Sequence, residues 1–150
     1  MRNYNEELDK LRSKVLRYAL YKKRTEKEIR TKFANENQDY LDEIIDFMIE
    51  DNYINDSEYI EAYFYESSIL RSQSIKEITF KLIEKGLNRN DIDKYIQAHS
   101  EDLQEYEINS AITLLNKRSD KEADKNISYL LNKGFSMDNI RLAINRLEDK

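Results

Sequence analysis

The chain contains no proline, no cysteine and no tryptophan, and it has only two glycines. Proline and glycine are the residues that most often mark turns, so a chain almost without them favours helices over strands joined by many turns. Without cysteine there can be no disulfide and no thiolate zinc site, which is typical of a reducing compartment. No stretch is apolar enough or long enough to cross a bilayer, and the first ten residues lack the apolar core of a signal peptide. We therefore predict an all-α protein of the cytoplasm.

Groups that carry catalytic chemistry are also scarce. His99 is the single histidine, and one histidine without cysteine partners cannot form a His-rich metal site or a recognisable nucleophile–base pair. Two glycines cannot build a phosphate-binding loop of the usual type. Neighbouring carboxylates such as Asp42 and Glu43, or Asp91 and Asp93, do not stand in an EF-hand-like loop. We predict a protein that is not an enzyme and that has no cofactor and no metal.

The two glycines occupy one place in a repeated pattern. Five positions recur 48 residues later, as Leu82 and Leu130, Gly86 and Gly134, Leu87 and Phe135, Ile92 and Ile140, and Ile96 and Ile144. Both glycines follow one helical run and precede another, where a helix end needs the positive φ that glycine adopts without strain. A fixed period of this size indicates a helical repeat protein, with Gly86 and Gly134 as its turn residues.

Three units of three helices are expected, with boundaries at 1–53, 54–98 and 99–150. Apolar periodicity predicts longer helices over about 5–23, 39–51, 56–70, 100–117, 120–133 and 136–148. Capping boxes at Thr25–Glu28 and Ser74–Glu77 predict the starts of two shorter helices. Asn37 stands where the later units have glycine, and asparagine tolerates positive φ best among the other residues. Stacked units of this kind predict an elongated, curved body.

The net charge of −5 hides a strong segregation of charge. Ten basic and two acidic residues lie between Lys10 and Lys32, whereas seven acidic residues and no basic one lie between Phe33 and Asp51. At 100° per residue, one helix face roughly 80° wide presents Lys10, Lys14, Arg17, Tyr21 and Arg24. Our hypothesis is a partner-binding surface. The alternative is that the acidic run folds against the basic helix and neutralises it.

Four stretches follow one another in an order and spacing that resemble a known family. They are Ala19–Ile29, Asp51–Tyr63, and the Lys-Gly pairs at 85–86 and 133–134. Together they resemble the RecX family, small regulators of the bacterial recombinase RecA, across almost the whole chain. The second stretch is similar to the family's run of glycine, tyrosine, an aliphatic residue and two aspartates, with Asn52 and Asn55 replacing the glycine and the first aspartate. Many relatives are basic and carry a Gly-Pro- and Arg-rich segment where this chain has residues 67–73.

The resemblance implies tandem three-helix repeats and a regulatory role in DNA recombination, DNA repair and the SOS response. It implies binding along the RecA–single-stranded-DNA filament and inhibition of its recombinase and coprotease activities. The implied partners are the RecA filament and, through it, single-stranded DNA; we expect a monomer that binds no membrane. The candidate contact residues are Lys10, Lys14, Arg17, Tyr21, Lys22, Lys23, Arg24, Lys27, Arg30 and Arg71.

Two other kinds of function remain open from the residues alone, nucleic-acid binding and the binding of other proteins. A helix, a glycine turn and a second helix occur twice, as in helix-turn-helix DNA-binding proteins, but the second helices begin near Asp91 and Asp138, which phosphates repel. Tyrosines at 59, 63 and 65 could stack on single-stranded bases, although tyrosines at helical spacing more often complete a core. The other function is that of a generic helical-repeat adaptor for proteins.

Overall fold

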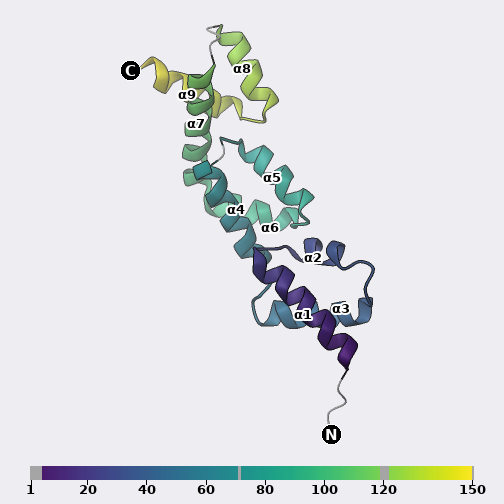
Figure 1. The fold of residues 1–150 in the computed structure, drawn as a ribbon. Helices are drawn as coiled ribbons and strands as arrows, with labels where there is room; N and C mark the ends of the chain where they lie inside the picture. The colour runs from purple at the N-terminus through teal and green to yellow at the C-terminus, as the bar shows by residue number, and fades with distance from the viewer. Residues whose placement is uncertain (1–4, 71, 119–121, 150) are drawn as a thin grey trace. The chain divides into compact units, whose positions relative to one another are not determined.

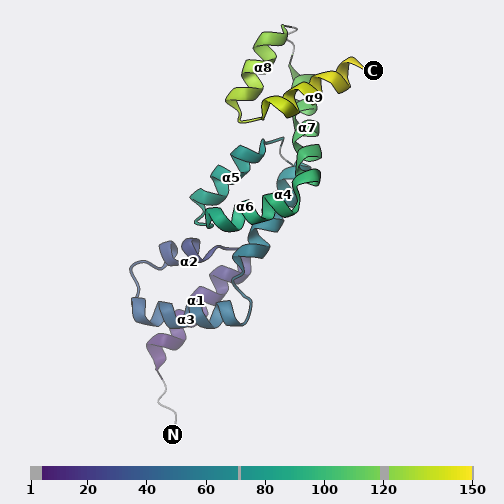
Figure 2. The ribbon, with the colours of Figure 1, turned by 180° about the vertical axis from the view of Figure 1, so that it is seen from behind.

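Helices are the regular elements of this protein wherever its structure is described. The computed structural model describes residues 5–70, 72–118 and 122–149, and within them it contains nine helices and no strand. Figures 1 and 2 show the helices in chain order. They are α1 (Glu6–Tyr21), α2 (Glu26–Lys32), α3 (Gln38–Glu50), α4 (Asp56–Leu70), α5 (Ile75–Glu84), α6 (Arg89–Ala98), α7 (Ser100–Lys117), α8 (Ala123–Asn132) and α9 (Met137–Glu148). The predicted all-α class is confirmed.

The helices form two compact units. The first contains the chain up to Tyr59 together with Lys85–Leu87, and the second contains Ile60–Glu84 and the chain from Asn88 onward. The short stretch Lys85–Leu87 is therefore the part of the later chain that belongs with α1, α2 and α3. The division into three units at residues 53 and 98 stays a prediction.

The core of the first unit comes from the periodic apolar positions of its three helices. Val15 from α1, Ile29 from α2, and Leu41 and Ile45 from α3 are fully buried. Each such side chain contributes about 1.5–3 kcal/mol relative to an exposed one. Ile49 has helical spacing with the α3 positions but is 45% exposed, so the apolar stripe of α3 is narrower than the periodicity indicated.

The second unit contains α7 packed against α9, and Figures 1 and 2 both show the two helices crossing. Ile108 and Ala111 on α7 meet Ile140 and Ala143 on α9 in one buried cluster. Glu107 lies beside them, only 3% exposed, and its carboxylate accepts hydrogen bonds from the backbone N–H of Ile75 and from the Asn139 side chain. A carboxylate bonded in this way is compatible with burial, because buried polar groups require partners.

Helix starts follow the predicted capping chemistry. Thr25 Oγ1 accepts from the Glu28 N–H at 3.1 Å, and the Glu28 carboxylate accepts from the Thr25 N–H at 3.0 Å. Ser74 and Glu77 repeat both contacts at 3.1 and 3.4 Å. Asn55 caps α4 by accepting from the Glu58 N–H at 3.0 Å. Both capping boxes are thereby confirmed.

Positive φ angles occur where the glycines stand. Gly86 and Gly134 each have φ of 96°, as predicted. The assignment of Asn37 to the same role is wrong, because its φ is −61° and its side chain caps α3 by accepting from the Tyr40 N–H. The connection from α2 to α3 is one residue longer than those that contain the glycines, so it turns without a positive φ. Among the described residues other than glycine, positive φ is found at Asn52, at 64°.

Candidate partner-binding surface

A basic hollow opens on the first unit between the end of α1 and the end of α2. Its volume is about 470 Å³, and it combines four cationic side chains with three aromatic rings. The lining residues are Lys14, Arg17, Tyr18, Tyr21, Arg24, Lys32 and Phe33. No carboxylate lines it, so every formal charge at this surface is positive. We call these seven residues the basic hollow.

Arg24 reaches the hollow by a route that helical projection does not describe. The helix α1 ends at Tyr21, and Lys22 is already extended, with φ of −157° and ψ of 166°. The placement of Arg24 on the same helical face is therefore wrong. Its guanidinium instead folds back over the Tyr18 ring, with Cζ 3.9 Å from the ring centroid, and its Nε donates to the Tyr18 carbonyl at 3.3 Å. Cation–π stacking and this hydrogen bond hold the charge in place.

Aromatic packing forms the floor of the hollow. Tyr18 meets Phe33 edge to face, with ring centroids 5.7 Å apart, and Lys32 Nζ lies 5.7 Å from the Tyr18 centroid. Tyr21 stands at the rim and is 83% exposed. The contribution of Lys32 was missed in the sequence because α2 brings it to α1 only through tertiary packing, for which no local signal exists.

Charge in the hollow is not neutralised from within the described chain. Lys14 and Arg17 are exposed, and the described residues offer them no ion pair. Lys22 and Lys23 are exposed in the turn that follows α1. Lys10, one helical turn before Lys14, pairs with Glu6 at 3.3 Å rather than with the acidic run of α3.

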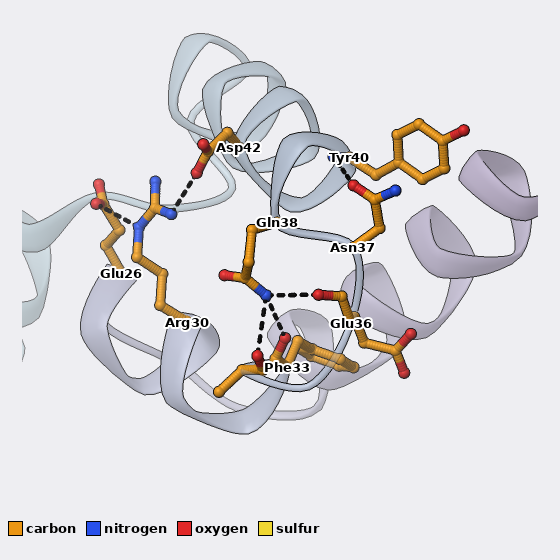
Figure 3. Close-up of polar contacts among 9 residues, drawn as sticks. Glu26, Arg30, Phe33, Glu36, Asn37, Gln38, Tyr40 and Asp42 are labelled. Atoms are coloured by element: carbon orange, nitrogen blue, oxygen red, sulfur yellow. Dashed lines mark hydrogen bonds and ion pairs between the residues drawn. The ribbon is translucent and has the colours of Figure 1, made fainter.

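Arg30 behaves differently, as Figure 3 shows. Its Nη1 lies 2.6 Å from Asp42 and its Nε lies 3.0 Å from Glu26, so it bridges α2 and α3. The hydrogen bond to Asp42 is the main reason that the pKa of Arg30 is raised. Intramolecular neutralisation, the alternative drawn from the charge pattern, therefore describes Arg30 and not the basic hollow.

The remaining candidates lie elsewhere. Lys27 lines a second hollow of about 490 Å³, next to Gly86 and Asp56, in which both signs of charge occur. Arg71 lies outside the described residues. The structure thus gathers Lys14, Arg17, Tyr21 and Arg24 at one surface and places the other described candidates around or away from it.

Three other possibilities concern metal binding, a membrane and stacking on bases. Across residues 5–70, 72–118 and 122–149, no three metal-ligating side chains come together, and no helix could span a membrane. His99 joins α6 to α7, and its ring lies 4.3 Å from that of Tyr95. On α4, Tyr63 and Phe64 are buried and Tyr65 is 67% exposed, so the helix does not expose its rings as a row for stacking on bases.

Comparison with known proteins identifies similar chains. The sequence is 31% identical over 151 residues to the Regulatory protein RecX of Clostridium perfringens strain 13, covering 95% of this chain and 70% of that one. It is 28% identical over 163 residues to the Regulatory protein RecX of Bacillus cytotoxicus, covering 98% of this chain but 57% of that longer one. No family model matches the sequence.

Solved structures give the same answer. The crystal structure of RecX from Lactobacillus salivarius superposes with a TM-score of 0.84 at 27% identity, over 97% of this chain and 99% of that one. A second crystal structure, of a regulatory protein RecX, has a TM-score of 0.79 at 21% identity over 93% of this chain, which supports the fold alone.

Proposed function

The chain belongs to the RecX family, and from this premise we propose that it binds the RecA filament on single-stranded DNA and inhibits it. Inhibition would cover recombinase activity, coprotease activity and filament extension, as part of DNA repair. The protein would act by binding and not by catalysis, as a monomer in the cytoplasm.

The basic hollow is the observation that carries this proposal beyond the family name. An acidic protein with a net charge of −5 keeps Lys14, Arg17 and Lys32 together without a carboxylate among them. Like charges held close repel one another, so packing alone gives no reason for the arrangement. A partner surface that is acidic, or the phosphates of its bound strand, would supply the missing counter-charge.

A filament also suits a chain with several helical units. A filament repeats the same protomer, so separate units of one regulator chain could bind more than one protomer. Several weak contacts on one chain then act together, because binding at one raises the effective concentration at the next. Affinity would be spread over the chain, whereas the basic hollow would mainly set the rate of association.

The test is ATP hydrolysis by a RecA filament on single-stranded DNA, measured against increasing concentrations of this protein. We expect Lys14→Glu with Arg17→Glu to raise the concentration needed for half-inhibition by at least about tenfold, with a thermal midpoint close to that of the parent, because both side chains are exposed. The association rate of the parent should fall with added salt, since salt screens the charges.

A matched control separates the surface from overall charge. Lys94→Glu with Lys117→Glu makes the same change in net charge on exposed lysines of α6 and α7, outside the hollow. Equal loss of inhibition in both double variants would show that net charge alone matters and would refute this surface. No inhibition by the parent at several-fold excess would favour an adaptor, and tight binding to duplex DNA alone would favour a helix-turn-helix protein.

A further inference from the structure

Two lysine–glycine turns are held by the same hydrogen bond. In the first unit, Thr25 Oγ1 donates to the Lys85 carbonyl at 2.6 Å. In the second unit, Ser74 Oγ donates to the Lys133 carbonyl, also at 2.6 Å. Each donor is the capping hydroxyl of a short helix, α2 or α5, and each acceptor directly precedes a glycine with positive φ. We call each of these contacts a seat.

Each hydroxyl performs two tasks at once. It accepts from the third amide of its own helix, at 3.1 Å from Glu28 N and from Glu77 N, and it donates to the distant carbonyl. A hydroxyl has one proton to donate, and at both seats the nearest acceptor is the turn carbonyl; for Ser74 the Glu77 carboxylate lies farther away, at 3.4 Å, than the Lys133 carbonyl at 2.6 Å. Thr25 and Ser74 are fully buried, and a donor or acceptor left without a partner there would be costly.

The glycines allow the close approach that the seat needs. A Cβ added at Gly134 would lie 2.9 Å from Ser74 Oγ and 3.0 Å from Lys76 Cβ. A Cβ added at Gly86 would meet the side chain of Lys27. Lys27 and Lys76 each stand two residues after the hydroxyl, so Thr/Ser-x-Lys-Glu on one helix faces Lys-Gly on the turn.

The first turn, which precedes α3, is closed in another way. Ala34 lies three residues before the cap Asn37, as Lys85 lies before Asn88 and Lys133 before Ser136. Its carbonyl accepts from Gln38 Nε2 at 3.1 Å, and the same amide serves the Phe33 and Glu36 carbonyls (Figure 3). These three carbonyls are served by a side chain next to the turn itself, and among the described residues no hydroxyl of another helix donates to the Ala34 carbonyl.

The helix α8 has no hydroxyl at its cap that could donate to the carbonyl of a turn. Its cap is Glu122, whose side chain makes no capping hydrogen bond, and an ionised carboxylate has no proton to donate. The pattern Thr/Ser-x-Lys-Glu is replaced there by Glu122-Ala123-Asp124-Lys125. The Thr25 and Ser74 seats are thus a matched pair, and α8 lacks the means to make another.

We infer that the two seats hold the lysine–glycine turns in place through the donated hydrogen bond, and that this role is separate from the capping of α2 and α5. The Thr25 seat keeps Lys85–Leu87 in the first unit, and the Ser74 seat holds Lys133–Phe135 against α5. The inference does not depend on the proposed function. It predicts that loss of the proton donor frees one turn and leaves its helix capped.

The test uses substitutions that separate donor from acceptor. Thr25→Asp and Ser74→Asp keep an oxygen that caps the helix, because aspartate is as good a cap as serine, but they cannot donate. Thr25→Ser and Ser74→Thr keep both functions and are the controls. Amide hydrogen exchange of the full chain, followed by mass spectrometry, reports on each turn and each helix separately.

We expect Thr25→Asp to speed exchange at least about tenfold in the peptide that spans 84–92, with the α2 amides and the 132–140 peptide within about twofold of the parent. Ser74→Asp should give the reciprocal result, and the two controls should behave as the parent. Unchanged exchange at 84–92 in Thr25→Asp, or equal acceleration of both turns by either aspartate, would overturn the inference. If an aspartate variant fails to fold, Thr25→Ala is measured in its place. Faster hydrogen exchange confined to α2 in that variant would also overturn the inference.

Discussion

Replacing Gly134 by alanine perturbs two features of the structure at once. An L-residue at φ of 96° is strained by about 1–2 kcal/mol. The new Cβ would also stand 2.9 Å from Ser74 Oγ, which must then move from its 2.6 Å contact with the Lys133 carbonyl. Weakening of that hydrogen bond costs about 1 kcal/mol. Together the two effects predict a loss of about 2–3 kcal/mol of unfolding free energy, and more for Gly134→Val, whose branched side chain tolerates positive φ least.

Urea denaturation followed by circular dichroism measures this loss, and Gly134→Asn is the matched control. Asparagine tolerates positive φ but carries the same Cβ. The Gly134→Asn variant should therefore lose only the part of the unfolding free energy that comes from the crowding of Ser74. Alanine and asparagine variants of equal stability would mean that crowding alone matters. An alanine variant within about 0.5 kcal/mol of the parent would refute both arguments, because neither the strain nor the displaced hydroxyl would then be real.

Two further predictions concern other sites. Asn52, at φ of 64°, should be replaceable by glycine within about 0.5 kcal/mol, whereas Asn52→Ala should lose about 1 kcal/mol in the same urea experiment; equal values for the two variants would contradict this. Arg146 lowers the pKa of Glu105 from its ordinary 4.5, chiefly through a hydrogen bond, so the stabilisation it gives is present above pH 4.5 and is lost as the pH falls through the lowered pKa of the folded state. The stability difference between the parent and Glu105→Gln should therefore shrink on acidification below pH 4.5, and a difference that grows there would contradict the assignment.

Local chemistry explains what could be read from the sequence. Capping boxes at Thr25 and Ser74, and positive φ at Gly86 and Gly134, depend on residues within one turn of each other. Most helix ends lie within two residues of the expected positions for the same reason. Asn37 shows the limit of such rules, because one additional residue in its connection removed the need for a positive φ.

Tertiary packing explains what could not be read. Arg24 was placed on a helix that ends three residues before it, and its guanidinium reached the hollow by stacking on Tyr18. Lys32 joins the same hollow from α2, and Asp42 neutralises Arg30 from α3. No local pattern shows which of ten neighbouring cations will find a carboxylate, because that depends on how two helices pack.

The seats also bear on the order of events during folding. They join residues 60 and 59 positions apart in the chain, whereas the capping contacts on the same hydroxyls span three. Closing the longer loops costs more chain entropy, so we expect the helices and their caps to form before the two Lys-Gly turns are fixed. On this expectation, a substitution at Gly134 acts on a contact that forms after the transition state of folding. Its cost would appear as faster unfolding, with the rate of folding little changed.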